Sequence, residues 1–245
     1  MLRRLACTLA VTLLVGCAPI APPAAIAPAS QGTVWLFFVD DLHIAFRKTG
    51  HLRDLLRALA NGLAEDRDLF AMRTTGPSSI SLDLTGDRTT VDEAIRRVSG
   101  SALKLSEIVE HKARSADEVQ HRFRISIGEA ERMLDEHEPG PVRRRVMLYL
   151  SDGYDIPNFR QRLTSFARAA RRANVRVFVL NTQVLPGEVG GAPADPAEQA
   201  RYSDSTRTSL QAIAESTGGS ALLDRATLAE AVQYIRTRSG IQDPR

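Results

Sequence analysis

Two unbroken apolar runs set the predicted architecture. Residues 33–39 (TVWLFFV) are apolar, β-branched or aromatic, and residues 146–150 (VMLYL) form a second such run. Runs of this kind are typical of strands buried on both faces, as in parallel sheets covered by helices on each side. We expect these two strands to lie at the centre of one sheet.

Four more segments are predicted as strands. Residues 79–84 alternate between apolar and polar side chains, which is typical of a half-exposed strand. Because only a short Gly76-Pro77 turn separates them from the strand at 68–73, the two should form an antiparallel hairpin. The other two predicted strands cover 175–180 and 220–223.

Helices are predicted between the strands, because apolar residues recur there every three or four positions. Thr90 and Glu93 have the spacing of a capping box, so one helix should begin at Thr90 and end before Gly100. Residues 183–204 have no such period and indicate a mobile loop. The other predicted helices cover 49–65, 115–137, 159–173, 207–216 and 226–238.

The order of elements is β-α-ββ-α-α-β-α-β-α-β-α. Strands that alternate with helices predict an α/β fold. We expect an open, mostly parallel, doubly wound sheet in a Rossmann-like three-layer sandwich, with one antiparallel edge strand. The domain should span 33–238, followed by a frayed tail at 239–245.

The first 17 residues predict export followed by lipid attachment. Arg3-Arg4 precede a short apolar run, and a membrane-spanning helix would need roughly 20 apolar residues. Leu14-Val15-Gly16-Cys17 resemble the bacterial lipobox, whose cysteine carries lipid. The alternative is an ordinary signal peptide that contains a cysteine. Lipidation of Cys17 would anchor the chain to a bacterial membrane through the Ala- and Pro-rich tether at 18–32.

The residue after Cys17, the charge balance and the cysteines limit the location, the partners and the stabilisation that we expect. Ala18, rather than an aspartate, follows Cys17, which favours the outer membrane where the host has one. Removal of Arg3 and Arg4 with the signal leaves 30 basic against 29 acidic side chains, which argues against a nucleic-acid partner. The cysteines are Cys7 and Cys17, so a mature domain without disulfides must be stabilised by an ordinary core.

Candidate chemistry follows the two central strands. Ligands of open α/β sheets bind at the carboxyl ends of the strands. Asp40 and Asp41 follow the first apolar run, and Ser151 and Asp152 follow the second. Such oxygens suit Mg²⁺ or another divalent cation. Aspartates after strands also cap helices and stabilise turns, and this alternative stays open.

The order of several segments resembles the von Willebrand factor type A domain, especially the bacterial branch of related proteins. The resemblance covers about 33–237. It rests on residues 39–43 (VDDLH), 73–87 (RTTGPSSISLDLTGD), 148–155 (LYLSDGYD), 173–180 (ANVRVFVL) and 210–219 (LQAIAESTGG).

This resemblance implies a metal-ion-dependent adhesion site in a degenerate form. Asp40 matches the first aspartate of that motif and Asp152 the last. Leu42 and Ile44 stand where the motif has serines, and the loop threonine has no counterpart near 99–105.

We therefore expect a membrane-anchored, non-enzymatic binding module that presents the carboxyl edge of its sheet to a protein partner in the cell envelope. The residues expected to contact the partner are His43, Thr74, Thr75, Ser78, Tyr154 and Asp155. Two alternatives remain. One is a metal-dependent phosphatase or hydrolase that uses Asp40 and Asp152, because Asp152-Gly153-Tyr154-Asp155 is similar to a motif of haloacid-dehalogenase-type phosphatases. The other is a purely structural envelope protein.

Overall fold

A computed structural model describes residues 32–102, 112–137, 143–184, 196–224 and 226–240. The predicted signal peptide, Cys17 and all but the last residue of the predicted tether lie outside these ranges, as do residues 241–245. Within the described ranges, no helix combines the length and the apolar character needed to cross a membrane.

A six-stranded sheet forms the middle layer, with the strand order β3-β2-β1-β4-β5-β6. Every neighbouring pair is parallel except β2 and β3, so the predicted mixed sheet with one antiparallel edge strand is confirmed. The two continuous apolar strands, β1 and β4, lie side by side at its centre. The strands are β1 (Thr33–Val39), β2 (Leu69–Thr74), β3 (Ser81–Thr85), β4 (Arg144–Ser151), β5 (Arg176–Asn181) and β6 (Ala221–Leu222).

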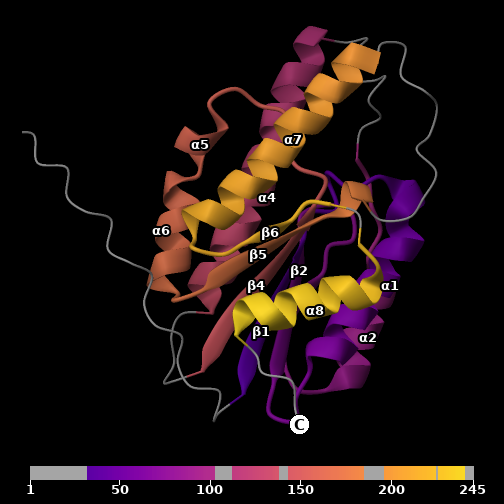
Figure 1. Cartoon of the computed structure of the whole chain (residues 1–245), viewed down its shortest axis with the longest axis vertical. Coiled ribbons are helices and arrows are strands. Elements are labelled where there is room, and N and C mark those ends of the chain that lie inside the picture. The colour runs from indigo at the N-terminus through magenta and orange to yellow at the C-terminus, as the bar shows by residue number, and fades with distance from the viewer. Residues whose placement is uncertain (1–31, 103–111, 138–142, 185–195, 225, 241–245) are drawn as a thin grey trace, which may run out of the picture.

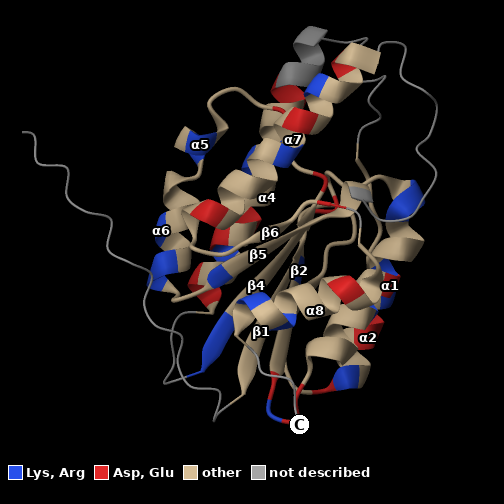
Figure 2. Ribbon diagram, in the orientation of Figure 1, with Lys and Arg blue, Asp and Glu red and all other residues tan. Residues whose placement is uncertain are grey.

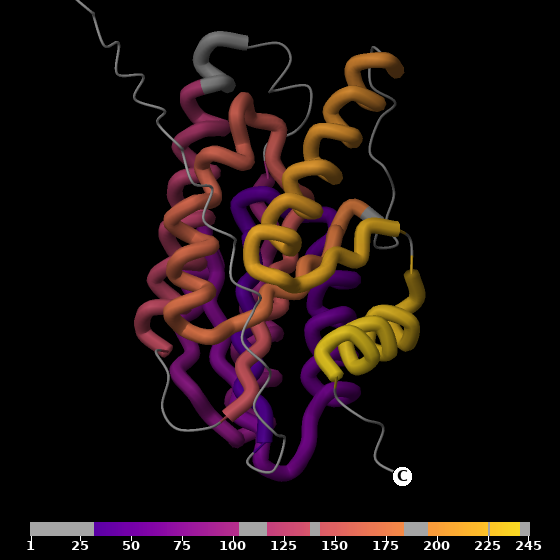
Figure 3. Tube along the Cα trace, turned by 60° about the vertical axis from the view of Figure 1, so that its left-hand side comes forward, coloured from indigo at the N-terminus to yellow at the C-terminus, as the bar shows by residue number. Residues whose placement is uncertain are grey.

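Helices cover both faces of the sheet, as Figures 1 and 3 show. One face carries α1 (Thr49–Leu63), α2 (Arg88–Arg97) and α8 (Leu228–Ser239). The other carries α4 (Lys112–Glu136), α5 (Phe159–Arg162), α6 (Thr164–Arg172) and α7 (Pro196–Ser216). Two short 3₁₀ helices, η2 (Phe46–Lys48) and η3 (Thr182–Val184), follow β1 and β5. Basic and acidic positions both occur along the outer helices (Figure 2).

The core consists of two apolar layers, one on each face of the sheet. Alternate side chains of β1 point to opposite faces. Trp35 and Phe37 therefore pack toward α1, whereas Leu36 and Phe38 pack toward α4. Each of these four side chains is fully buried. The packing fixes the end of β1, and with it the position of Asp40.

The predicted capping box at Thr90 is wrong. Helix α2 begins at Arg88, and its N-cap is Asp87, whose carboxylate accepts hydrogen bonds from Thr89 N at 2.9 Å and Thr90 Oγ1 at 2.6 Å. Aspartate caps a helix at least as well as threonine, and Asp87 comes earlier in the chain. A capping box does occur at the start of α8, between Thr227 and Glu230.

The predicted loop at 183–204 is wrong for its last part, because α7 already begins at Pro196. Proline is favoured in the first turn of a helix, and Glu198 in that turn interacts well with the helix dipole. This part of the helix is mostly polar and has no fully buried residue before Thr206, so it lacks the apolar period on which the prediction relied. The predicted helix at 159–173 is divided at Leu163 into α5 and α6.

Candidate functional site

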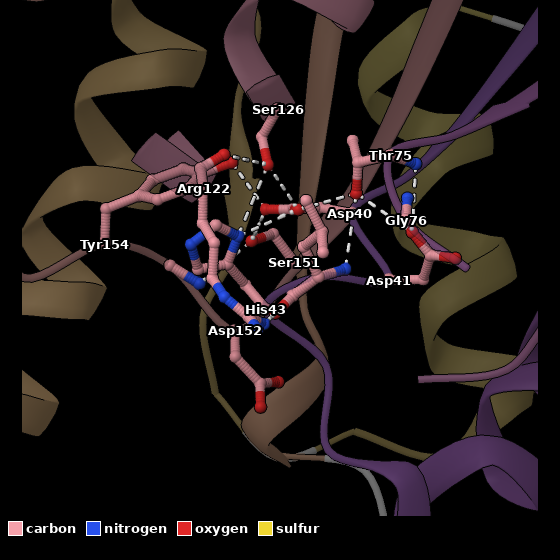
Figure 4. A network of polar contacts seen from close by, with 12 residues as sticks. Asp40, Asp41, His43, Thr75, Gly76, Arg122, Ser126, Ser151, Asp152 and Tyr154 are labelled. Carbon is pink, nitrogen blue, oxygen red and sulfur yellow. Dashed lines mark hydrogen bonds and ion pairs between the residues drawn. The ribbon is translucent and has the colours of Figure 1, made fainter. Parts of the chain in front are cut away.

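Asp40 is the centre of a buried polar network at the carboxyl end of the sheet (Figure 4). It is the first residue after β1, and its side chain is fully buried. Five protein groups have a polar atom within hydrogen-bond distance of its carboxylate. They are His43 Nδ1 (2.9 Å), Ser126 Oγ (2.7 Å), Ser151 Oγ (2.8 Å), the Tyr154 phenol (2.5 Å) and Thr75 Oγ1 (3.1 Å), whose single proton is shared with Asp41. We refer to these six residues as the Asp40 network.

The network keeps Asp40 ionised inside the protein. Burial by itself raises the pKa of a carboxyl group, because it disfavours the charged form. At Asp40 the charge of His43 and the hydrogen bonds from His43, Tyr154 and Ser126 outweigh burial, and together they hold its pKa below the ordinary value. Asp40 is therefore a buried anion.

Tyr154 supplies the shortest of the hydrogen bonds to Asp40. Its ring packs against His43, Phe123 and Phe159, and its phenol also contacts the phenol of Tyr149. Burial, reinforced by the charge of Asp40, raises the pKa of both tyrosines well above the ordinary value. Both phenols therefore stay protonated, and Tyr154 remains a hydrogen-bond donor.

Asp41 shapes the loop between β2 and β3. Its Oδ1 accepts hydrogen bonds from Thr75 N (2.9 Å), Thr75 Oγ1 (2.9 Å) and Gly76 N (2.5 Å), and its Oδ2 accepts one from Ser78 N (3.1 Å). A carboxylate that accepts several backbone N–H groups acts as a turn cap. The side chain of Asp41 is fully buried in this role.

Asp152, after β4, faces a different set of groups. Lys48 Nζ donates to its Oδ1 at 3.1 Å and its Oδ2 at 2.9 Å, and Thr182 Oγ1 also donates to Oδ1. The adjacent Gly153 has a φ of +86°, and a Cβ there would lie 2.4 Å from the carbonyl oxygen of Thr206. This glycine lets the loop after β4 pass close to α7.

The four predicted metal ligands do not fit a divalent cation in this arrangement. The carboxylate of Asp152 points away from Asp40, and that of Asp41 is engaged by the β2–β3 loop (Figure 4). Ser151 donates to Asp40 and accepts from Gly153 N at 3.0 Å, so its hydroxyl is already engaged. No group of three or more His, Cys, Asp or Glu side chains that could hold a metal ion occurs within the described ranges. Metal binding by these residues stays a prediction, which a binding measurement can check.

The six predicted partner contacts differ in how much of each residue reaches solvent. Thr74, Thr75 and Tyr154 are buried, which does not fit direct contact with a partner. They instead support the surface above them through hydrogen bonds within the Asp40 network and the β2–β3 loop. His43, Ser78 and Asp155 are partly exposed. Asp155 pairs with Arg201 at 3.2 Å.

Two members of the site lacked a clear signal in the sequence. Ser126 is fully buried on α4, one residue before Ile127, on the face that packs against the sheet. A serine within an apolar stripe was the signal that could have revealed it. Lys48 lies 104 residues from Asp152, and no local pattern links such positions.

A polar cleft of about 370 Å³ opens beside the β2–β3 loop. Its charged side chains pair with one another, Arg73 with Glu136 and Arg132 with Glu129, both at 2.5 Å. This pairing leaves the cleft close to neutral. Its walls consist of Arg73, Thr74, Thr75, Gly76, Ser79, Ile80, Ser81, Glu129, Arg132 and Glu136.

Comparison with known proteins places the fold. No protein-family model matches the chain, and no curated protein matches its sequence. Among solved structures, an aerotolerance-related membrane protein from Bacteroides fragilis is similar with a TM-score of 0.55 at 13% identity, covering 86% of this chain and 100% of that one. The VWA domain of SpRpn10 is similar with a TM-score of 0.51 at 12% identity, covering 86% of this chain and 99% of that one.

The pilus adhesin SpaC from Lactobacillus rhamnosus GG is also similar, with a TM-score of 0.51 at 13% identity over 88% of this chain. The match covers 30% of the adhesin. At such low identities the similarity concerns the fold alone. The chain has the fold of a von Willebrand factor type A domain, as the sequence resemblance implied.

Proposed function

We propose that this protein is a membrane-anchored, non-enzymatic binding module. It presents the carboxyl end of its sheet to a protein partner in the cell envelope. The observation that carries the proposal is an exposed aromatic ring at that end of the sheet, held on a rigid turn beside the Asp40 network.

That ring is Phe46, the first residue of η2, and 73% of its surface is exposed. It is the most exposed large hydrophobic residue within the described ranges. Ile44 on one side is fully buried, and Lys48 on the other is held by Asp152. The turn is therefore fixed at both ends. A rigid aromatic side chain contributes much of the binding energy at protein interfaces and loses little entropy on binding.

The Asp40 network argues against a hydrolase. A phosphatase nucleophile must reach its substrate, whereas Asp40 is fully buried and surrounded by hydrogen-bonding side chains of the protein. Asp40, His43 and Ser126 also do not form a catalytic triad. Ser126 Oγ and Asp40 Oδ1 both lie near the same imidazole nitrogen, Nδ1, at 3.3 and 2.9 Å. A triad needs the serine and the carboxylate on opposite ring nitrogens.

The position of the predicted tether supports an outward-facing site. The tether ends at residue 32, where β1 begins, and Asp40 follows the other end of β1. A strand of this length spans roughly 20 Å. The candidate face therefore lies at the end of β1 opposite the residue at which the predicted tether joins the domain. A lipid on Cys17 would hold the domain at the membrane and leave that face accessible.

Affinity capture of the tagged full-length protein from its own membranes tests the proposal. Phe46→Ser should reduce recovery of a specific partner about tenfold, which corresponds to the loss of one buried aromatic contact. Leu84→Ser is the matched control, because Leu84 is also exposed but lies on the edge strand β3. Equal recovery by both variants would contradict the assigned face. Turnover of a phosphoester that Asp40→Asn abolishes would contradict a non-enzymatic role.

A further inference from the structure

Lys48 and Asp152 form an ion pair at the edge of the candidate face. The ammonium donates to both carboxylate oxygens, at 3.1 and 2.9 Å, and the two side chains are only 12% and 13% exposed. Water therefore screens this pair less than it screens a surface ion pair. Thr182 donates a further hydrogen bond to the same carboxylate.

The carboxylates of the three aspartates at this edge accept hydrogen bonds from three different kinds of donor. Asp40 accepts side-chain donors from its network, Asp41 accepts mainly backbone N–H groups, and Asp152 accepts an ammonium. Asp152, like Asp40, is an aspartate that the family resemblance assigns to metal binding. It is also the only one of these three to which a lysine or arginine donates in the described part of the chain.

We propose that the Lys48 ammonium is the permanent cation of this site and makes the domain independent of divalent metal ions. A lysine carries one charge on a flexible stem with three N–H donors, and two of these donors are used here. A covalently attached cation cannot be removed by a chelator. This inference deepens the proposed function, because it concerns the same face, but it does not depend on the identity of a partner.

The ion pair also positions the turn that carries Phe46. Lys48 is the last residue of η2 and the N-cap position of α1. Its bond to Asp152 joins this turn to the loop after β4, 104 residues further along the chain. Asp152 thus restrains the turn that carries Phe46 through Lys48.

Thermal unfolding of the full-length protein and its variants tests this inference. Wild type should unfold at the same temperature in EDTA and in millimolar Mg²⁺, Mn²⁺ or Ca²⁺. Lys48→Ala should lower the unfolding midpoint by about 5 °C, because it leaves a partly buried carboxylate without its cation. Since the shortened side chain leaves space beside Asp152, these ions should restore at least half of that loss.

Two variants serve as controls. Lys48→Met removes the charge but fills the space, so its midpoint should fall similarly and the ions should not restore it. The double variant Lys48→Ala, Asp152→Asn should also be insensitive to the ions. The inference would be overturned if wild type responds to EDTA, if Lys48→Ala is as stable as wild type, or if no ion moves the Lys48→Ala midpoint.

Calorimetry on wild type provides a measure that does not require the variants to fold. The expected result is no saturable heat with millimolar Mg²⁺, Mn²⁺ or Ca²⁺. Saturable binding of any of these ions to wild type would overturn the inference. Failure to capture a partner would count against the proposed function and leave these metal results unaffected.

Discussion

The phenol of Tyr154 donates a 2.5 Å hydrogen bond to Oδ2 of Asp40, and this contact joins the loop after β4 to the end of β1. The two residues are 114 positions apart in the chain. In open α/β sheets this edge is where ligands bind. Here the protein's own side chains donate hydrogen bonds to the Asp40 carboxylate at this edge. The edge is therefore a preformed, rigid support for the surface above it.

Replacement of Asp40 by asparagine should destabilise the domain strongly. The amide keeps the size of the carboxylate but removes its charge, and it turns an N–H₂ group toward hydroxyl donors. We expect a loss of about 3–5 kcal/mol in the free energy of unfolding, as measured by urea denaturation.

Ser126→Ala is the matched control, because it removes one of the five hydrogen-bonding groups around Asp40 and leaves the charge in place. It should cost about 1–3 kcal/mol. If the two variants lose the same small amount, Asp40 is not the centre of the network.

The contribution of Asp40 should depend on pH. Because its pKa is lower in the folded protein than in the unfolded chain, the stabilisation is fully present above the unfolded value of 3.8 and decreases as the pH falls toward the folded pKa. The difference in unfolding free energy between wild type and Asp40→Asn should therefore shrink as the pH falls below about 4. A difference that grows on acidification would mean that the pKa of Asp40 is raised instead.

Replacement of Asp41 by alanine should loosen the β2–β3 loop and leave the sheet intact. Three backbone N–H groups, those of Thr75, Gly76 and Ser78, lose their acceptor in this variant. Hydrogen exchange at these amides should accelerate about tenfold, which corresponds to roughly 1.4 kcal/mol. The amides of Phe70 and Ala71 in β2 provide the internal control. Unchanged exchange in the loop would show that another group holds it.

Cys17→Ser should release the protein from the membrane without altering its fold. The predicted lipid chains contribute about 0.8 kcal/mol for each buried methylene, so their loss removes the anchor. Fractionation of cells should then place the variant in the soluble fraction, with the thermal unfolding midpoint of the wild-type domain. A variant that stays in the membrane fraction would contradict lipidation of Cys17.

The sequence predicted the fold well because the burial of a strand determines its pattern of apolar and polar residues. The uninterrupted run in β1 and β4 identified the centre of the sheet, and the alternation before Leu84 identified the edge strand. Asp40 and Asp152 were recognised because residues that follow parallel strands share one edge.

What these aspartates bind did not follow from local patterns. The partners of Asp40 and Asp152 include Ser126 and Lys48, which lie 86 and 104 residues away. Such contacts depend on how α4 and η2 pack, and packing is not encoded in spacing along the chain. No local pattern showed that the ring of Phe46 is exposed, because an aromatic residue after a strand is more often part of the core.

Photo-crosslinking from position 46 in living cells, with and without a chelator, tests the central claim most directly. A photoreactive amino acid in place of Phe46 should form one specific adduct with an envelope protein, and the adduct should persist after treatment with EDTA. The same amino acid in place of Leu84 should not form it. No specific adduct from position 46, or an adduct that EDTA abolishes, would contradict a metal-independent binding face at this end of the sheet.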